Sequence, residues 1–353
     1  MYRCSNLLHK CEMRKVLVKL TEERKRTGEL GSLGPARFEP PAEFFRRYAR
    51  DQRLVHSIKT LAPVIAIGDI HGDFLALLSI LFVTGVIDAQ GHWKGRNSIV
   101  VLCGDLLDRG GRGDVTVSTT PNYREEVDIL QYLHALNLKA KPGHVIAVLG
   151  NHEIRNIYMD QSFEHYQDSP QVEGWGGLQE KYSLFRPGGP VSTYFSNHFP
   201  IILQVNHFLF AHGGYQGGSP NELNREVQAA LRSGKVLSPR LNFILEDRSG
   251  SCDRKALQGW DGLVLGHTVV EEVKGTCQNK VWMVDIAMSE AFGESRKLGA
   301  LEIQFSPGQT LIKTLMYERN TLKAEYYLNG QHVATKTTKF HRRGQRLVGS
   351  SFS

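Results

Sequence analysis

The 353-residue chain has few cysteines, and their distribution argues against a disulfide framework or a cysteine-based zinc site. Their number is odd, and no two of them form a Cys-x-x-Cys pair. Such usage is typical of an intracellular protein with reduced thiols, so we expect an intracellular, cytoplasmic location. The cysteines that we expect to be reduced are Cys4, Cys11, Cys103, Cys252 and Cys277.

Long apolar runs are also missing from the sequence. No stretch of about eighteen apolar residues occurs, which argues against a transmembrane helix. The N-terminus lacks the continuous apolar core of a secretory signal, and its basic, amphipathic character leaves a transit peptide as the less favoured interpretation. Hydrophobic residues make up 41% of the chain and charged residues 22%, which is typical of a globular protein with a substantial core.

The net charge of +7 resides at the two ends of the chain. Residues 1–62 carry 14 Lys/Arg against 7 Asp/Glu, and residues 331–353 carry 5 Lys/Arg and no acidic residue. The segment between them is therefore net negative. Basic ends of this kind are either solvated tails or weak contacts for nucleic acid or anionic lipid, and both interpretations stay open.

Linker and turn residues divide the chain into three parts. We expect a basic N-terminal extension over 1–62, because it contains the linker signal GELGSLGP. An α/β domain follows over 63–320, with a Gly-, Pro- and aromatic-rich insertion at about 160–200 that we expect to act as a lid. Residues 321–353 predict a β-hairpin, whose Asn329–Gly330 pair suits a type I′ turn, and then a basic tail.

Three strand–loop–helix units follow one another in the α/β domain. Apolar runs at 63–69, 98–105 and 144–151 each end in Gly-Asp or Gly-Asn, and each precedes a helical pattern. This alternation predicts parallel strands with helical crossovers. Further β-rich segments after residue 200 predict a second half packed against the first, with helices outside. Active sites in such sheets lie beyond the carboxyl ends of the strands.

Polar side chains stand at five of the predicted strand ends. Singly, each has an ordinary interpretation, since an Asp after a strand is often a helix N-cap and a His beside Gly is often a turn residue. Together they predict a site. The residues are Asp69, His71, Asp105, Asp108, Arg109, Asn151, His152, Glu153, His212 and His267.

This mixture of carboxylate, imidazole and amide oxygen suits divalent metal ions, and a shared carboxylate can bridge two of them. Two such ions roughly 3.5–4 Å apart are the standard device for in-line phosphoryl displacement. A water bridging them becomes hydroxide near neutral pH and acts as the nucleophile. The strand ends therefore predict a dinuclear phosphoryl-transfer site.

The motifs GDIHG, GDLLDRG, GNHE, HGG and GHT occur in this order across residues 68–268. This set resembles the signature of the PPP-type metallophosphoesterases, which have the calcineurin-like fold. FRPGGP and the later VDIAMS and GALEI are similar to the Shewanella-like serine/threonine protein phosphatases. The resemblance implies an α/β/β/α sandwich of two mixed sheets flanked by helices, two divalent ions (Mn, Fe or Zn) and hydrolysis of phosphoserine, phosphothreonine or phosphotyrosine in proteins.

The resemblance also implies roles for the strand-end residues. His152 would be the general acid that protonates the leaving oxygen, with Asp108 as its orienting partner; a carboxylate neighbour favours the protonated imidazole. Asp69 and His71 would hold the first metal, and Asp105 would bridge both. The residues that would complete the second metal site are Asn151, His212 and His267.

Two arginines would bind the phosphate together with Asn151. Arg109 of GDLLDRG suits bidentate binding of this anion. The second arginine is either Arg248 or Arg186 of FRPGGP, with Arg248 slightly favoured. The relatives tend to carry Trp-x-Arg at this point, whereas Glu246 and Asp247 precede the arginine here.

Two alternatives to a protein phosphatase stay open. The same chemistry could act on dinucleoside polyphosphates or RNA 5′-phosphates, which the basic ends support. An interaction module that has lost activity is disfavoured, because all six implied metal ligands are present. The motif GHT is followed by Val269 rather than His, which disfavours nuclease chemistry.

Overall fold

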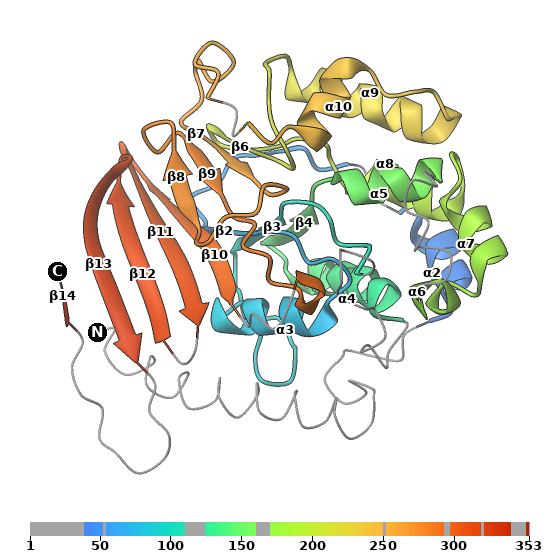
Figure 1. The fold of residues 1–353 in the computed structure, drawn as a ribbon, viewed down its shortest axis with the longest axis horizontal. Helices are drawn as coiled ribbons and strands as arrows, with labels where there is room; N and C mark the ends of the chain where they lie inside the picture. Colours follow the sequence, from blue (N-terminus) through green and yellow to red (C-terminus); the bar gives the residue numbers. More distant parts are fainter. Residues whose placement is uncertain are drawn as a thin grey trace.

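Two mixed β-sheets form the centre of the fold, and helices lie outside them, as the sequence predicts (Figure 1). Most of the two basic ends, on which the expected anionic contacts depend, lies outside the described part of the chain. The structure, a computed structural model, describes residues 39–51, 54–109, 124–159, 170–249, 252–292, 297–318, 321–339 and 351–352.

The larger sheet has eight strands in the order β14-β13-β12-β11-β10-β2-β3-β4. The strands of the three predicted units pair in parallel and in register, with Ile67 opposite Leu102 and Leu102 opposite Ala147. Their carboxyl ends therefore lie side by side. The strands are β2 Val64–Ile67, β3 Ile99–Leu102, β4 His144–Ala147, β10 Leu298–Ser306, β11 Gln309–Glu318, β12 Thr321–Leu328, β13 Gln331–Lys339 and β14 Ser351–Phe352.

The smaller sheet has six strands in the order β1-β5-β6-β7-β9-β8. Its strands β6 and β7 are parallel, with Ala211 opposite Leu265, so the strand ends before His212 and His267 are neighbours. The strands are β1 Ser57–Ile58, β5 Leu203–Val205, β6 Phe208–Ala211, β7 Gly262–Leu265, β8 Lys274–Thr276 and β9 Val281–Met283.

Helices follow each of the three parallel strands of the larger sheet. Helix α3 (Phe74–Val83) is almost entirely apolar and starts at Asp73, whose side chain accepts a hydrogen bond from Ala76 N at 2.9 Å. Among the described residues, no helix is long and apolar enough to cross a membrane. The other helices are α2 Pro41–Tyr48, α4 Glu125–Lys139, α5 Asn151–Tyr158, α6 Pro170–Gly174, α7 Leu178–Phe185, α8 Pro190–His198, α9 Pro220–Ser233, α10 Pro239–Glu246 and the 3-10 turn η3 Glu290–Phe292.

The described part of the expected insertion, residues 170–198, is helical. Helices α6, α7 and α8 gather with α2 on the side of the molecule away from β11–β13 (Figure 1). Trp175, Phe185 and Phe195 are fully buried there and belong to the same hydrophobic cluster as the strands of the two sheets. Its role as a lid stays a prediction.

The predicted hairpin is present. Strands β12 and β13 are joined by Asn329 and Gly330, whose φ angles of +48° and +80° suit a type I′ turn. The hairpin extends the larger sheet through β11 and β10, and these strands project beyond the helical part of the molecule (Figure 1).

The expectation of reduced thiols is wrong for one pair of cysteines. Cys252 and Cys277 form a disulfide, with their Cα atoms 5.6 Å apart, whereas Cys103 is free and buried. The turn after β8 places Cys277 beside the segment that follows α10. This proximity depends on the tertiary fold, and the spacing of the two cysteines in the sequence gives no sign of it.

We expect replacement of both Cys252 and Cys277 by serine to lower the free energy of unfolding by about 3 kcal/mol, because the disulfide closes a loop of 25 residues. Urea denaturation of the double variant and of the parent protein measures this change. Equal stability of the two proteins would contradict a structural role for the disulfide, and reductant should destabilise only the parent.

Candidate active site

Side chains from five strand ends meet at one edge of the two sheets. Asp69 and Asp105 follow β2 and β3, Asn151 begins α5 beyond β4, and His212 and His267 follow β6 and β7. Each of the five residues is at most 3% exposed. The register of the parallel strands is the cause of this convergence, since it aligns their carboxyl ends.

The backbone at the site is in an unusual conformation. His71, Asp105, Asp108 and His267 all have positive φ angles, between +44° and +62°, although none is glycine. Such residues are strained and persist only where the surroundings hold them, and they cluster at functional sites.

Two glycines allow the strand ends to approach one another closely. A Cβ at Gly104 would lie 2.7 Å from His212 Nδ1 and 2.8 Å from Gly150 Cα. A Cβ at Gly150 would overlap both the backbone nitrogen and the carboxylate of Asp105. Side chains at these positions would separate Asp105 from its neighbours.

The first group of ligand atoms surrounds the ring of His71. Its Nε2 lies 3.7 Å from Asp69 Oδ2 and 3.7 Å from Asp105 Oδ2. Its Nδ1 lies 3.2 Å from the carbonyl oxygen of Leu107, to which it can donate a proton. That contact directs the Nε2 lone pair towards the two carboxylates, where a metal would bind.

The second group contains Asp105, Asn151, His212 and His267. His212 Nε2 lies 3.3 Å from Asp105 Oδ1 and 2.9 Å from Asn151 Oδ1, while its Nδ1 lies 2.7 Å from the Cys103 carbonyl. The ring of His267 packs against that of His212, with centroids 4.7 Å apart. Asp105 therefore belongs to both groups, as a bridging ligand must.

The charges of the site fit divalent cations. Burial, together with the neighbouring Asp285, raises the pKa of Asp69 well above its ordinary value. Burial alone would lower the pKa of His212, but Asp105 and Asp69 raise it to about 10. Carboxylates buried this close together need positive charge, and a metal ion replaces the protons that otherwise supply it.

His267 gives a second indication that the residues fit a metal ion. Its Nε2 is buried and has no hydrogen-bond partner among the described residues. Burial, with His212 and Arg248, lowers the pKa of this imidazole to about 3, so it is neutral and can donate a lone pair. Asp105, His212 and His267 place their ligand atoms within 4.8 Å of one another.

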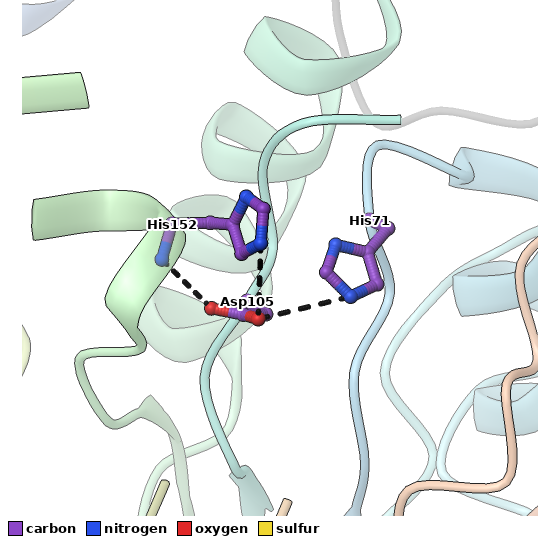
Figure 2. Close-up of side chains that lie close together, drawn as sticks. All are labelled: His71, Asp105 and His152. Atoms are coloured by element: carbon purple, nitrogen blue, oxygen red, sulfur yellow. Dashed lines mark hydrogen bonds and ion pairs between the residues drawn. The ribbon is translucent and has the colours of Figure 1, made fainter. Parts of the chain in front are cut away.

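His152 and Asp108 form a hydrogen-bonded pair beside the metal groups. His152 Nδ1 donates to Asp108 Oδ2 at 2.8 Å, and Asn156 Nδ2 donates to both oxygens of the same carboxylate at 3.0 and 2.9 Å. Figure 2 shows His152 and His71 on either side of the Asp105 carboxylate, with His152 Nε2 3.8 Å from Asp105 Oδ2. This geometry suits proton transfer. His71, Asp105 and His152 could also hold one ion together, so metal ligation is a second use of this imidazole.

Glu153 belongs to the site, but no role was predicted for it from the sequence. Its buried carboxylate accepts hydrogen bonds from the backbone N–H groups of Gly150, Asp105, Leu106 and Leu107 at 2.9–3.2 Å. It thereby fixes the loop that presents Asp105. Its position in the motif GNHE was the available signal, but its partners lie 46–48 residues earlier in the chain, except for Gly150.

The predicted phosphate-binding arginines differ in their surroundings. Arg109 is buried, and its guanidinium contacts the carboxylates of Glu125, Glu290 at 3.3 Å and Asp73 at 3.6 Å. It is therefore engaged by three acidic groups and would have to exchange at least one of them for a phosphate. Its place beside Gly72 nevertheless keeps it next to the His71 loop.

Arg248 lies at the site, whereas no described contact links Arg186 to it. Arg248 is exposed and donates to the carbonyl oxygen of His267 at 2.6 Å, next to the second metal group. Arg186 is exposed at the end of α7. The geometry thus favours Arg248 as the second arginine.

Glu246 is a second residue whose role the sequence did not reveal. Its Oε2 accepts a hydrogen bond from Asn151 Nδ2 at 3.3 Å and lies 4.0 Å from His267 Nε2. Arg155 balances its charge, at 3.0 Å. Because Glu246 binds the amide nitrogen of Asn151, the amide oxygen faces His212, as a metal ligand should.

The sequence profile of the calcineurin-like phosphoesterase family matches residues 62–274, which is more than half of the chain. This segment contains every residue of the two metal groups. The chain therefore belongs to the calcineurin-like phosphoesterases and is a phosphoester hydrolase.

Two relatives confirm the resemblance to the Shewanella-like phosphatases. The chain is 25% identical to Shewanella-like protein phosphatase 2 of Arabidopsis thaliana, over 73% of this chain and 79% of the relative. It is 30% identical to Shewanella-like protein phosphatase 1 of Plasmodium berghei, over 66% of this chain and 69% of the relative.

A solved structure shares the fold. The cold-active protein-tyrosine phosphatase of a psychrophilic Shewanella species superimposes with a TM-score of 0.57, covering 80% of this chain and 82% of that one. Sequence identity between the two is 22%. The likeness therefore concerns the fold.

Proposed function

We propose that this protein is a metal-dependent phosphatase that removes phosphate from serine and threonine side chains of proteins. The observation that carries the proposal is the His152–Asp108 pair, placed beside a carboxylate shared by two groups of metal ligands. The relatives named as protein phosphatases support a protein substrate.

The residues divide the work of phosphate-ester hydrolysis among them. Asp69, His71 and Asp105 would hold one divalent ion (Mn, Fe or Zn), and Asp105 would share the second with Asn151, His212 and His267. When bound, such ions neutralise the phosphate charge and activate water for in-line displacement.

Other side chains would transfer the proton and bind the phosphate. His152 carries a proton at Nδ1 that Asp108 accepts, so the ring is oriented to donate from Nε2 to the leaving oxygen. Burial alone would raise the pKa of Asp108, but His152 and Lys181 hold it below its ordinary value, so it stays an acceptor. Arg248, with Arg109 and Asn151, would bind the phosphate oxygens.

Phosphotyrosine is the second candidate substrate, because the structure that shares the fold is that of a protein-tyrosine phosphatase. Dinucleoside polyphosphates and RNA 5′-phosphates are a third class. The observation in favour of this third class is the basicity of the chain ends, and most of these ends lies outside the described residues.

We expect the purified protein, loaded in turn with Mn²⁺, Fe²⁺ or Zn²⁺, to release phosphate from phosphoserine and phosphothreonine peptides faster than from matched phosphotyrosine peptides or diadenosine tetraphosphate. Comparison of kcat/KM over this panel measures the preference. Faster turnover of phosphotyrosine or of diadenosine tetraphosphate would replace the proposed substrate. No turnover of any phosphomonoester with any of the three metals would refute the activity.

A further inference from the structure

Lys181 is a charged side chain in the interior of the helical segment. It lies on α7 and is fully buried. Its Nζ is 3.8 Å from Glu126 Oε2, and it lies over the rings of Trp175 and Phe185, 5.8 and 5.3 Å from their centroids. Lysine is almost never fully buried unless it is paired, so this position calls for an explanation.

Glu126 connects this lysine to the active site. It lies in the first turn of α4, is fully buried, and accepts hydrogen bonds with both carboxylate oxygens. Oε1 accepts from the backbone N–H of Asp108 at 2.9 Å, and Oε2 accepts from Trp175 Nε1 at 2.8 Å. One carboxylate therefore joins the segment containing α6 and α7 to the loop that carries Asp108.

Asp108 needs such an anchor. Its φ of +62° is a left-handed conformation that an aspartate keeps only when its surroundings hold it. Its carboxylate is the partner of His152 Nδ1, so a small rotation of this loop would reorient the imidazole. Catalytic groups displaced by about 1 Å can lose a hundredfold in rate.

We propose that Lys181 is a positioning residue for the phosphatase reaction, which fixes Asp108, and through it His152, by holding the Glu126 carboxylate in place. This role rests on the proposed function of the site. The described contacts of the lysine are with Glu126, Trp175 and Phe185, so its effect on the reaction would pass through Glu126.

The test replaces Lys181 by methionine, which keeps the length and apolar stem of the side chain but removes the charge. We expect kcat on a phosphoserine peptide to fall about tenfold or more, with KM changed less than about threefold, because the acid is misplaced while phosphate binding is not. Lys181→Arg, which keeps the charge, should recover part of the lost kcat. Lys235→Met, the same change at an exposed lysine, should leave both constants unchanged.

If Lys181→Met alone does not fold, a double replacement tests the proposal. Lys181→Met combined with Glu126→Gln removes both charges and leaves no unpaired ion in the interior, yet a neutral amide is a weaker acceptor for Asp108 N–H. This double variant should also show reduced kcat. A folded Lys181→Met or double variant with the kcat of the parent protein would overturn the proposal.

Proton NMR separates this inference from the proposed activity. The hydrogen-bonded N–H of His152 should give a downfield resonance in the parent protein, assigned by its loss in His152→Asn. In Lys181→Met this resonance should shift or broaden, whether or not a phosphoester is turned over. An unchanged resonance would refute the positioning role even if the protein were an active phosphatase.

Discussion

Replacement of Asp105 by asparagine is expected to abolish phosphatase activity and to reduce the metal content of the protein. Asp105 is the only described residue common to both groups of ligand atoms, so the change weakens both metal sites at once. Asparagine keeps the size of the side chain but removes the charge that attracts the cations. Metal ions held at these residues would contribute several kcal/mol of transition-state stabilisation, so we expect kcat/KM to fall by about three orders of magnitude or more.

Metal content per chain, measured by mass spectrometry after dialysis, and kcat/KM on a phosphopeptide test this expectation together. Asp261→Asn makes the same change at an exposed aspartate before β7 and should retain both the metal and the activity. A variant at position 105 that is folded and fully active would exclude the shared carboxylate as the centre of the site.

The asparagine variant should not unfold the protein. Burial would raise the pKa of Asp105, but His212, His152 and His71 hold it well below its ordinary value in this structure. Such a carboxylate stabilises the fold above its unfolded pKa, and its contribution is lost as the pH falls through the lower, folded pKa. The metal-free variant therefore lacks this contribution at neutral pH, and we expect it to be less stable than the parent protein but still folded.

Local patterns predict most of the elements that carry the site. The apolar runs before Asp69 and Asp105 end in glycine and are followed by helical periodicity, which is enough to predict parallel strands and a common edge. The Asn329–Gly330 turn is likewise a local feature with a fixed backbone requirement. Such features depend on neighbours a few residues away, which a single sequence contains.

Interactions between distant segments were not predictable in this way. The Trp175–Glu126–Lys181 cluster unites α4 with a segment whose Gly-rich sequence indicated an irregular insertion. The Cys252–Cys277 disulfide depends on the turn after β8. In both cases the pairing arises from tertiary packing, which overrides local composition.

Replacement of His152 by asparagine is expected to lower kcat, and the loss should be larger for substrates whose leaving group needs a proton. A serine alkoxide is a poor leaving group and needs a proton, so we expect a loss of about 10²–10⁴-fold on a phosphoserine peptide. The p-nitrophenolate ion leaves without protonation, so the loss on p-nitrophenyl phosphate should be much smaller. Steady-state kcat on the two substrates, measured with the same metal-loaded preparation, gives the comparison.

Metal analysis of the same variant distinguishes the two uses of this imidazole. If His152 is the general acid, the metal content stays that of the parent protein, and Asp108→Asn shows the same dependence on the leaving group with a smaller loss. Equal losses on both substrates, accompanied by loss of one metal per chain, would instead make His152 a ligand with His71 and Asp105. The 2.8 Å hydrogen bond between Nδ1 and Asp108 favours the first outcome, because it holds the ring with Nε2 directed away from Asp108, towards the Asp105 carboxylate.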